Sequence, residues 1–315
     1  MNASKRNWLK FGGTVIVAGV LSMGCSKKGG EGSAEGAGSA TEAAGNADKG
    51  KKTSIQNIGS DTMVNLAQAW AEAYSKIEPN VSVEVSGGGS GVGIAALING
   101  TAEIANSSRM LEPEEKEKAK AKVGADPKEF LVAFDGLAIY VHKSNPLEQI
   151  SVEELSELYK ENGSINNWSQ LGVKVPDAKG DEIVRVSRQN NSGTYHYFRE
   201  HVVGKKNDFK PGSLDMNGSK DVVEQVGKTP GSIGYSGLGY ATPAVKILKV
   251  SAKKGEPGVM PSNATVMDKT YPVARPMFMY TPGEPSAAAK KYLDWVLSPA
   301  GQKVVEETGY VPLGK

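Results

Sequence analysis

One local pattern recurs three times in this chain, and it constrains the fold more than any other feature. A short run rich in β-branched residues leads into a turn of small residues, and a helical pattern follows. The three copies of strand and turn are residues 55–58 with 59–62, residues 81–85 with 87–91, and residues 183–186 with 188–194. This alternation of strand and helix predicts an α/β protein.

The turns of this pattern suit a small anion. Free backbone N–H groups and the helix dipole attract negative charge to a helix start, Gly allows close backbone approach, and Ser or Thr adds a hydroxyl donor. Any one turn is better explained as a helix cap, because Ser and Thr cap many helices. Three such turns, the last of which begins with Arg188, favour a small oxyanion held where the helix starts converge.

Several segments have clear helical signals. The apolar residues of the first predicted helix fall on one face, namely Met63, Leu66, Trp70, Tyr74 and Ile77. Ser151 and Glu154 stand at capping-box spacing and predict a helix start. Residues 286–298 and 299–308 predict two consecutive helices, because Pro299 interrupts the pattern.

The composition excludes several classes of function. The chain has 315 residues, which is enough for two domains with cores of their own. A single Cys excludes a disulfide framework, a Cys-rich zinc site and a CxxC redox pair. The formal net charge of +2 argues against a nucleic-acid-binding protein. Three His residues without an HExxH pattern offer little for a metal, and we expect neither a metal nor a cofactor.

The amino-terminal residues predict export from the cytoplasm. Residues 1–24 have a basic head, a short apolar body at 11–23 and a small residue before Cys25, as in a secretory signal. Cys25 is the only Cys and lies directly at this boundary. The segment resembles a bacterial lipoprotein signal, although Ser22 stands where that pattern usually has Leu. We expect a lipid anchor at Cys25; an ordinary cleaved signal with an incidental Cys is the alternative.

Residues 25–54 are expected to be the lipidated Cys and a flexible tether. The stretch 26–54 consists largely of Gly, Ala, Ser, Glu and Lys, so it cannot bury enough apolar surface to fold. As a flexible chain it would reach roughly 30 Å; a pro-peptide is the alternative. Residues 55–315 keep 29 of the 37 basic and 31 of the 35 acidic side chains, so the folded part is slightly anionic. Selection of an anion must therefore come from local donors.

At these residues the sequence resembles the periplasmic phosphate-binding proteins of ABC phosphate importers, the PstS family. The resemblance covers nearly all of residues 55–315, and the order and spacing of its motifs are specific. The motifs are Gly59-Ser60-Asp61-Thr62, Gly89-Ser90-Gly91, Ile104-Ala105-Asn106-Ser107-Ser108-Arg109, Arg188 with Ser192-Gly193-Thr194, Thr229-Pro230-Gly231-Ser232-Ile233-Gly234-Tyr235, and the ending from Leu297 to Leu313.

The resemblance implies a two-lobed type 2 periplasmic-binding-protein fold with a ligand cleft between the lobes. Lobe one would comprise residues 55–136 plus 239–315, and lobe two residues 137–238. Crossing segments at 134–136 and 235–239 would form the hinge. A ligand that touches both lobes only in the closed state would favour closure.

The resemblance also implies which residues bind phosphate. The expected phosphate-binding residues are Asp61, Thr62, Ser90, Gly91, Ser108, Arg188, Ser192, Gly193 and Thr194. Further candidates beside them are Ser60, Ser107 and Arg109.

Two positions depart from the family pattern. Ser108 stands where the family often has an Asp that accepts the proton of phosphate and so disfavours unprotonated sulfate. We hypothesise that Asp61 takes this acceptor role; a helix N-cap is the alternative. Asn190 stands where an acid often partners the site Arg, so Arg188 is held less rigidly or by another acid.

The predicted function is capture of inorganic phosphate and its delivery to the permease subunits of an ABC importer in the inner membrane. The protein would be a monomeric, non-enzymatic lipoprotein, periplasmic or at the cell surface, attached to a bacterial membrane and without nucleic-acid partners. One alternative is a receptor for another oxyanion such as sulfate or arsenate. The other is a secreted Ser hydrolase, because residues 251–254 match SxxK, although no SDN or KTG motif accompanies them.

Overall fold

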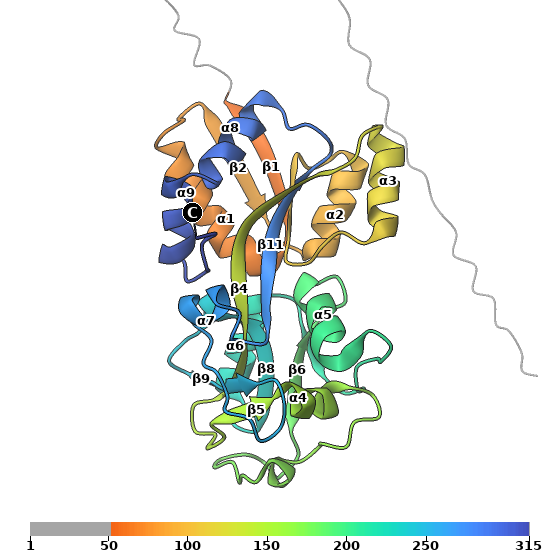
Figure 1. The fold of residues 1–315 in the computed structure, drawn as a ribbon, viewed down its shortest axis with the longest axis vertical. Coiled ribbons are helices and arrows are strands. Elements are labelled where there is room, and N and C mark those ends of the chain that lie inside the picture. Colours follow the sequence, from red (N-terminus) through yellow and green to blue (C-terminus); the bar gives the residue numbers. More distant parts are fainter. Residues whose placement is uncertain (1–51, 315) are drawn as a thin grey trace, which may run out of the picture. The chain divides into compact units, whose positions relative to one another are not determined.

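A nine-stranded sheet organises residues 52–314, which are the residues described by this computed structural model (Figure 1). The strand order is β2 (Val81–Ser86), β1 (Thr53–Gly59), β3 (Ile104–Ser107), β11 (Ala274–Thr281), β4 (Lys128–His142), β8 (Ser232–Gly237), β6 (Val184–Arg188) and β7 (Leu214–Met216), with β9 (Val245–Ile247) paired to β4. The signal, Cys25 and nearly all of the expected tether lie outside the described residues, whereas residues 53 and 54 already belong to β1.

Strand β4 joins two groups of strands. Its residues 128–136 pair with β11, and its residues 137–142 pair with β8 and β9. We call β1, β2, β3, β11 and residues 128–136 the first strand group, and β6, β7, β8, β9 and residues 137–142 the second strand group. The change of partner falls between Gly136 and Leu137, where the sequence analysis placed a lobe boundary.

The pairing of two short strands departs from the expected lobes. β9 pairs with residues 140–142 of β4, and β10 (Lys249–Ser251) pairs in parallel with β5 (Gln149–Ser151). Residues 245–251 therefore lie beside strands of the expected lobe two, although the sequence predicted them in lobe one. The chain crosses back along β11, so the second crossing segment is β11 and not residues 235–239 (Figure 1). Three-residue strands carry too little periodicity to reveal such pairing.

Helices accompany both strand groups. The first group is covered by α1 (Val64–Ser75), α2 (Ser90–Asn99), α3 (Pro113–Val123), α8 (Ala287–Val296) and α9 (Pro299–Glu307). The second carries α4 (Val152–Tyr159), α5 (Gly193–Phe198), α6 (Ser219–Lys228) and α7 (Asn263–Met267). Short 3-10 helices span Asp61–Met63, Trp168–Leu171 and Leu238–Tyr240, and α5 continues as a π-helix over Arg199–Gly204.

All three predicted copies of strand, turn and helix are present. β1 leads through the 3-10 helix to α1, β2 leads to α2, and β6 leads to α5. β1 is parallel to β2 and β3, while β6 is parallel to β7 and β8. Because the carboxyl ends of parallel strands meet at one sheet edge, each group gathers its turns at one edge. The α/β prediction is confirmed.

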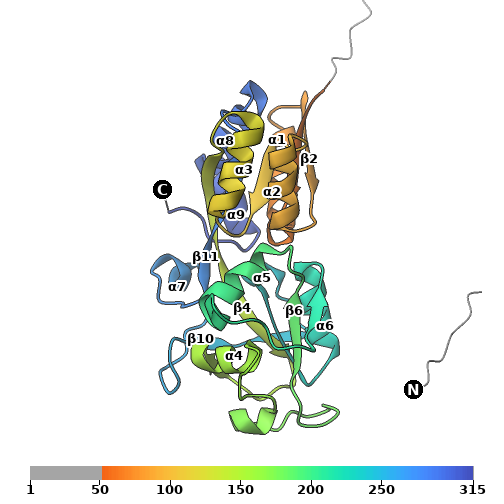
Figure 2. The ribbon, with the colours of Figure 1, turned by 90° about the vertical axis from the view of Figure 1, so that its right-hand side faces the viewer.

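Strand geometry explains why β11 contributes to two different buried clusters. Successive side chains of β11 point to opposite faces. Met277 and Met279 join a buried cluster with residues of α1, α8 and α9, whereas Phe278 and Tyr280 join one with residues of α2. Figure 2 shows α1, α2, α3, α8 and α9 together around the first strand group. Ile77 was expected on the buried face of the first helix but is 56% exposed, because α1 ends at Ser75 and Ile77 lies in the following turn.

The predicted capping box at the start of α4 is present and has a measurable consequence. Ser151 Oγ accepts from Glu154 N at 3.1 Å, and Glu154 Oε2 accepts from Ser151 N at 3.0 Å. We expect Ser151→Ala to lower the free energy of unfolding by about 1 kcal/mol in urea denaturation. Ser156→Ala, within the same helix, is the control and should change stability little. Equal stability of both variants would show that the box contributes nothing.

Candidate functional site

The turns of the two strand groups touch each other. Gly91 N donates to the carbonyl oxygen of Asn191 at 3.0 Å, and Asn191 Nδ2 donates to the carbonyl oxygen of Gly88 at 2.9 Å. Gly89 has φ 99°, in the left-handed region that favours Gly, and a Cβ there would lie 2.6 Å from the Asn191 carbonyl oxygen. The turn after β2 and the turn after β6 are therefore in backbone contact.

Gly193 lies against two of the predicted hydroxyls. A Cβ built at Gly193 would lie 2.5 Å from Ser108 Oγ and closer still to Ser90 Oγ. Ser90 Oγ and Ser108 Oγ are 3.4 Å apart, and Ser108 N donates to Ser90 Oγ at 3.1 Å. All three residues are buried. Three predicted site residues from three separate turns therefore converge.

Arg188, at the end of β6, is only 1% exposed and is held by four acceptors. Its Nη1 donates to Ser219 Oγ at 2.9 Å, and its Nη2 donates to Asp61 Oδ2 at 3.0 Å. Further bonds run from Nη2 to the Asn217 carbonyl oxygen at 2.7 Å and from Nε to the Met216 carbonyl oxygen at 3.3 Å. Burial lowers the pKa of Arg188, although the attraction of Asp61 opposes this shift.

Asp61 is the partner of Arg188 from the other strand group. Its Oδ1 accepts from Gly88 N at 2.9 Å, and its Oδ2 accepts from Arg188. The cap position of its helix is Ser60, and the carboxylate accepts from groups of two other segments. The helix-cap alternative for Asp61 is therefore wrong. Asp61 is the other acid that holds Arg188, in place of Asn190.

The two threonines of the predicted site also meet. Thr62 Oγ1 and Thr194 Oγ1 are 2.8 Å apart, and Thr62 Oγ1 is 3.4 Å from Ser219 Oγ. Ser192 is the N-cap of α5, and its Oγ accepts from Thr194 N at 3.1 Å and Tyr195 N at 3.4 Å. The hydroxyl of Ser192 is therefore used locally, whereas the hydroxyls of Thr62 and Thr194 join the strand groups.

The three further candidates bond mostly within their own segments. Ser60 is buried, and its Oγ has no partner in the described part of the chain. Ser107 Oγ donates to the Arg109 carbonyl oxygen at 2.7 Å. Arg109 pairs with both carboxylate oxygens of Glu115 at 2.7 Å. Burial opposes ionisation of Glu115, but the bonds from Arg109 and from Glu112 N outweigh it, so the pKa of Glu115 is lowered.

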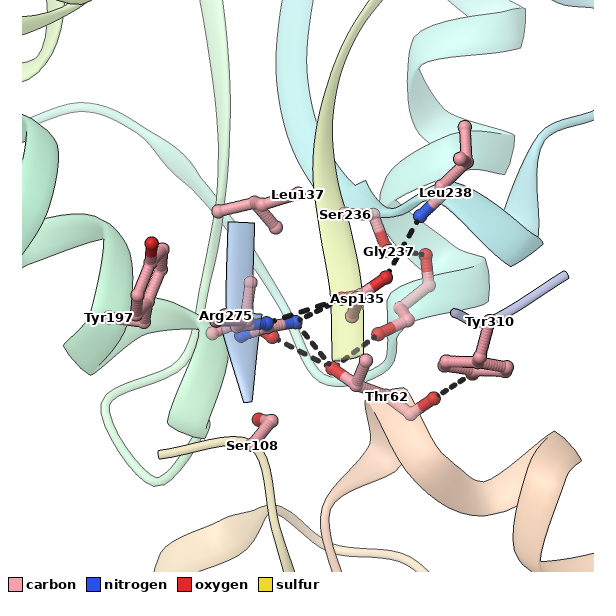
Figure 3. A network of polar contacts seen from close by, with 12 residues as sticks. Thr62, Ser108, Asp135, Leu137, Tyr197, Ser236, Gly237, Leu238, Arg275 and Tyr310 are labelled. Carbon is pink, nitrogen blue, oxygen red and sulfur yellow. Dashed lines mark hydrogen bonds and ion pairs between the residues drawn. The ribbon is translucent and has the colours of Figure 1, made fainter. Parts of the chain in front are cut away.

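A buried ion pair beside Thr62 was missed by the sequence analysis (Figure 3). Arg275 on β11 donates from Nη2 and Nε to Asp135 Oδ2 on β4, at 2.9 and 3.2 Å, and neither side chain is exposed. Arg275 Nη2 also donates to Thr62 Oγ1 at 3.2 Å. Burial raises the pKa of Asp135 despite the attraction of Arg275. The available signal was one charged residue inside an apolar run of each strand, Asp135 within residues 130–141 and Arg275 within β11, since buried charges are almost always paired.

The Ser and Lys of the SxxK motif, on which the hydrolase alternative rests, bond to residues outside the predicted phosphate site. Ser251 Oγ donates to the Lys253 carbonyl oxygen at 2.9 Å, and Lys254 Nζ pairs with Glu154 at 3.4 Å.

Across residues 52–314, no group of three or more His, Cys, Asp or Glu side chains could hold a metal ion. Within that same range, no helix is both long and apolar enough to span a membrane.

Two strand groups with polar turns meeting between them define a solute-binding protein of the type 2 periplasmic-binding-protein fold. A family model described as a PBP superfamily domain matches residues 30–300. The fold class expected from the sequence is confirmed.

Individual relatives narrow the class. The chain is 34% identical over 274 residues to the phosphate-binding protein PstS of Pseudomonas aeruginosa, covering 84% of each chain. It is 30% identical, with a TM-score of 0.74, to a phosphate ABC transporter substrate-binding protein with bound phosphate from Clostridium perfringens, covering 83% of this chain and 100% of that one. An ABC-type phosphate transport receptor from Vibrio cholerae gives 28% identity and a TM-score of 0.64, over 82% and 99% of the two chains. This chain belongs to the PstS family of phosphate-binding proteins.

Proposed function

We propose that this protein captures inorganic phosphate between its two strand groups and delivers it to the permease of an ABC importer. The observation that carries the proposal is the Asp61–Arg188 pair, which joins the strand groups amid the hydroxyls of Thr62, Thr194 and Ser90. Relatives named as phosphate-binding proteins, one of them with bound phosphate, support this ligand.

The chemistry of these groups matches a partly protonated oxyanion. A guanidinium and several hydroxyls donate to phosphate oxygens, and Arg forms charge-assisted bonds with phosphate geometry especially well. The backbone N–H of Gly193, at the start of α5, adds a neutral donor, whereas Gly91 N and Thr194 N already donate to Asn191 and Ser192. Asp61 supplies an acceptor for the phosphate proton. The set holds and orients an anion, and we propose that the protein is a receptor and not an enzyme.

Capture requires two lobes that approach each other. We propose lobe one as residues 55–136 plus 274–315 and lobe two as residues 137–273, which moves the second boundary to β11. The proposed ligand residues come from both lobes, so bound phosphate favours the closed arrangement. β4 and β11 link the lobes and absorb the movement.

We also propose that the protein works outside the cytoplasm, as a monomer attached through Cys25. The basic head, apolar body and single Cys of the amino-terminal sequence support this. Mass spectrometry of the protein purified from membranes should find a lipid on Cys25 and no residues before it. Recovery of the protein without a lipid would leave an ordinary cleaved signal.

Calorimetry on the full-length chain in detergent tests the function. We expect phosphate to bind at one site and arsenate, which has the same shape and protonation, to compete with it. Sulfate should bind much more weakly, because it carries no proton for Asp61 to accept. Absence of binding by any of the three anions would refute the proposal, and tighter binding of sulfate would favour the oxyanion alternative.

A further inference from the structure

Arg275 has a donor group that the protein itself does not use. Its guanidinium is fully buried, and Nε and Nη2 bond to Asp135 and Thr62. Its Nη1 has no hydrogen-bond partner within residues 52–314. A buried N–H without a partner loses its hydrogen bonds to water and gains none within the protein. Such groups are therefore rare unless a ligand or an ordered water binds them. Arg188, by contrast, has a partner on each of its three side-chain nitrogens.

Arg275 also lies next to the predicted site. Thr62 Oγ1 accepts from Arg275 Nη2 and is 2.8 Å from Thr194 Oγ1. Thr62 Oγ1 is also 3.4 Å from Ser219 Oγ, which accepts from Arg188 Nη1. The two buried guanidinium groups are thus connected through two hydroxyls. An anion that contacts these hydroxyls lies within reach of both.

A cavity of about 140 Å³ adjoins Arg275. Ser108 and Arg275 are its most buried polar residues, whereas the acids Glu112 and Glu200 of its lining are exposed or half-exposed. Figure 3 shows Arg275 between Asp135 and Tyr197, with Ser108 below it. The guanidinium carbon lies 5.7 Å from the centre of the Tyr197 ring. The buried end of the cavity therefore offers a cation and a hydroxyl together.

We propose that Arg275 is a second guanidinium ligand of the bound oxyanion and donates Nη1–H to one of its oxygens. This rests on the proposed capture of phosphate and adds a ligand from a crossing strand to those from the turns. Asp135 is a positioning residue, because it holds Nε and Nη2 and leaves Nη1 free. Each guanidinium is paired with one carboxylate, so Arg275 adds a directed, charge-assisted donor without adding net charge.

The test compares Arg275→Gln and Arg275→Lys by calorimetry with inorganic phosphate. Arg275→Gln should weaken binding by about tenfold to 100-fold, the range expected for a hydrogen bond between charged groups. Arg275→Lys keeps the charge and should lose less. Arg185→Gln is the matched control, because Arg185 is also buried and its Nε also lacks a partner in the described chain. This control should bind phosphate as the unmodified protein does.

Loss of Arg275 leaves Asp135 buried without its partner, so folding needs a separate check. The double variant Asp135→Asn with Arg275→Gln removes both charges, and thermal melting establishes that it is folded. Wild-type phosphate affinity in the folded double variant would refute the proposal.

A crystal structure of the wild-type protein with bound phosphate tests directly whether Arg275 binds the anion. Nη1 should lie about 2.7–3.2 Å from a phosphate oxygen. A separation above about 4 Å would refute the proposal while leaving phosphate capture intact. Absence of phosphate binding by the wild-type chain would instead refute the proposed function.

Discussion

Asp61→Asn is expected to weaken phosphate binding by about tenfold or more and to strengthen sulfate binding. The carboxylate accepts from Gly88 N and Arg188, and each of its oxygens keeps a second lone pair for the phosphate proton. Unprotonated sulfate would place an acceptor against this acceptor, at the cost of desolvation without a hydrogen bond. An Asn amide donates instead, so the penalty on sulfate disappears. Competition calorimetry with the two anions measures the ratio of phosphate affinity to sulfate affinity.

The same substitution also affects folding, and a control separates the two effects. Arg188 would lose its ionic partner, which costs about 3 kcal/mol or less, because the Asn oxygen still accepts and the Asp61 side chain is 15% exposed. Asp126→Asn removes an exposed carboxylate that pairs with Lys120 at 3.2 Å and should leave both affinities unchanged. An unchanged phosphate-to-sulfate ratio in folded Asp61→Asn would show that Asp61 is not the proton acceptor.

Gly193→Ala is expected to weaken phosphate binding by about 100-fold, equivalent to about 2.7 kcal/mol, while the protein remains folded. The new methyl group would lie 2.5 Å from Ser108 Oγ and nearer to Ser90 Oγ, both on the other strand group. Separation of the strand groups relieves the clash, so folding survives, but the ligand residues no longer close around phosphate. Titration calorimetry and thermal melting measure the two effects separately.

Gly100→Ala is the matched control for this substitution. Gly100 ends α2 with φ 72° and has no heavy atom within 4 Å of a built Cβ. Alanine there should cost about 1 kcal/mol of stability through its backbone conformation and leave phosphate affinity unchanged. If Gly193→Ala bound phosphate as the wild type does, the contact between the strand groups would not be needed for binding.

Much of the proposed site could be found from the sequence because it lies in turns with a local signal. Arg188 ends β6, Ser90 and Thr194 each follow a strand within a few residues, and strand periodicity locates them. The convergence of these turns follows from parallel pairing, because carboxyl ends of parallel strands share an edge.

The remaining features depend on pairing between distant segments. Arg275 and Asp135 are separated by 140 positions in sequence, and their pairing depends on the register of β11 against β4. Likewise, Asp61 holds Arg188, which lies 127 positions away in the sequence. No local sequence pattern predicts either of these two contacts.

The sequence by itself determined the α/β class, the three strand–turn–helix units and the family of this protein. These follow from short-range periodicity and from the order of the motifs along the chain, and neither depends on which residues are in contact. Only the tertiary structure decided that Asp61 holds Arg188, that β11 is the second crossing strand, and that Arg275 is buried with an unused donor. The physical reason is that a buried charge must find its partner in space, and sheet register, which joins residues far apart in the chain, decides which partner it meets.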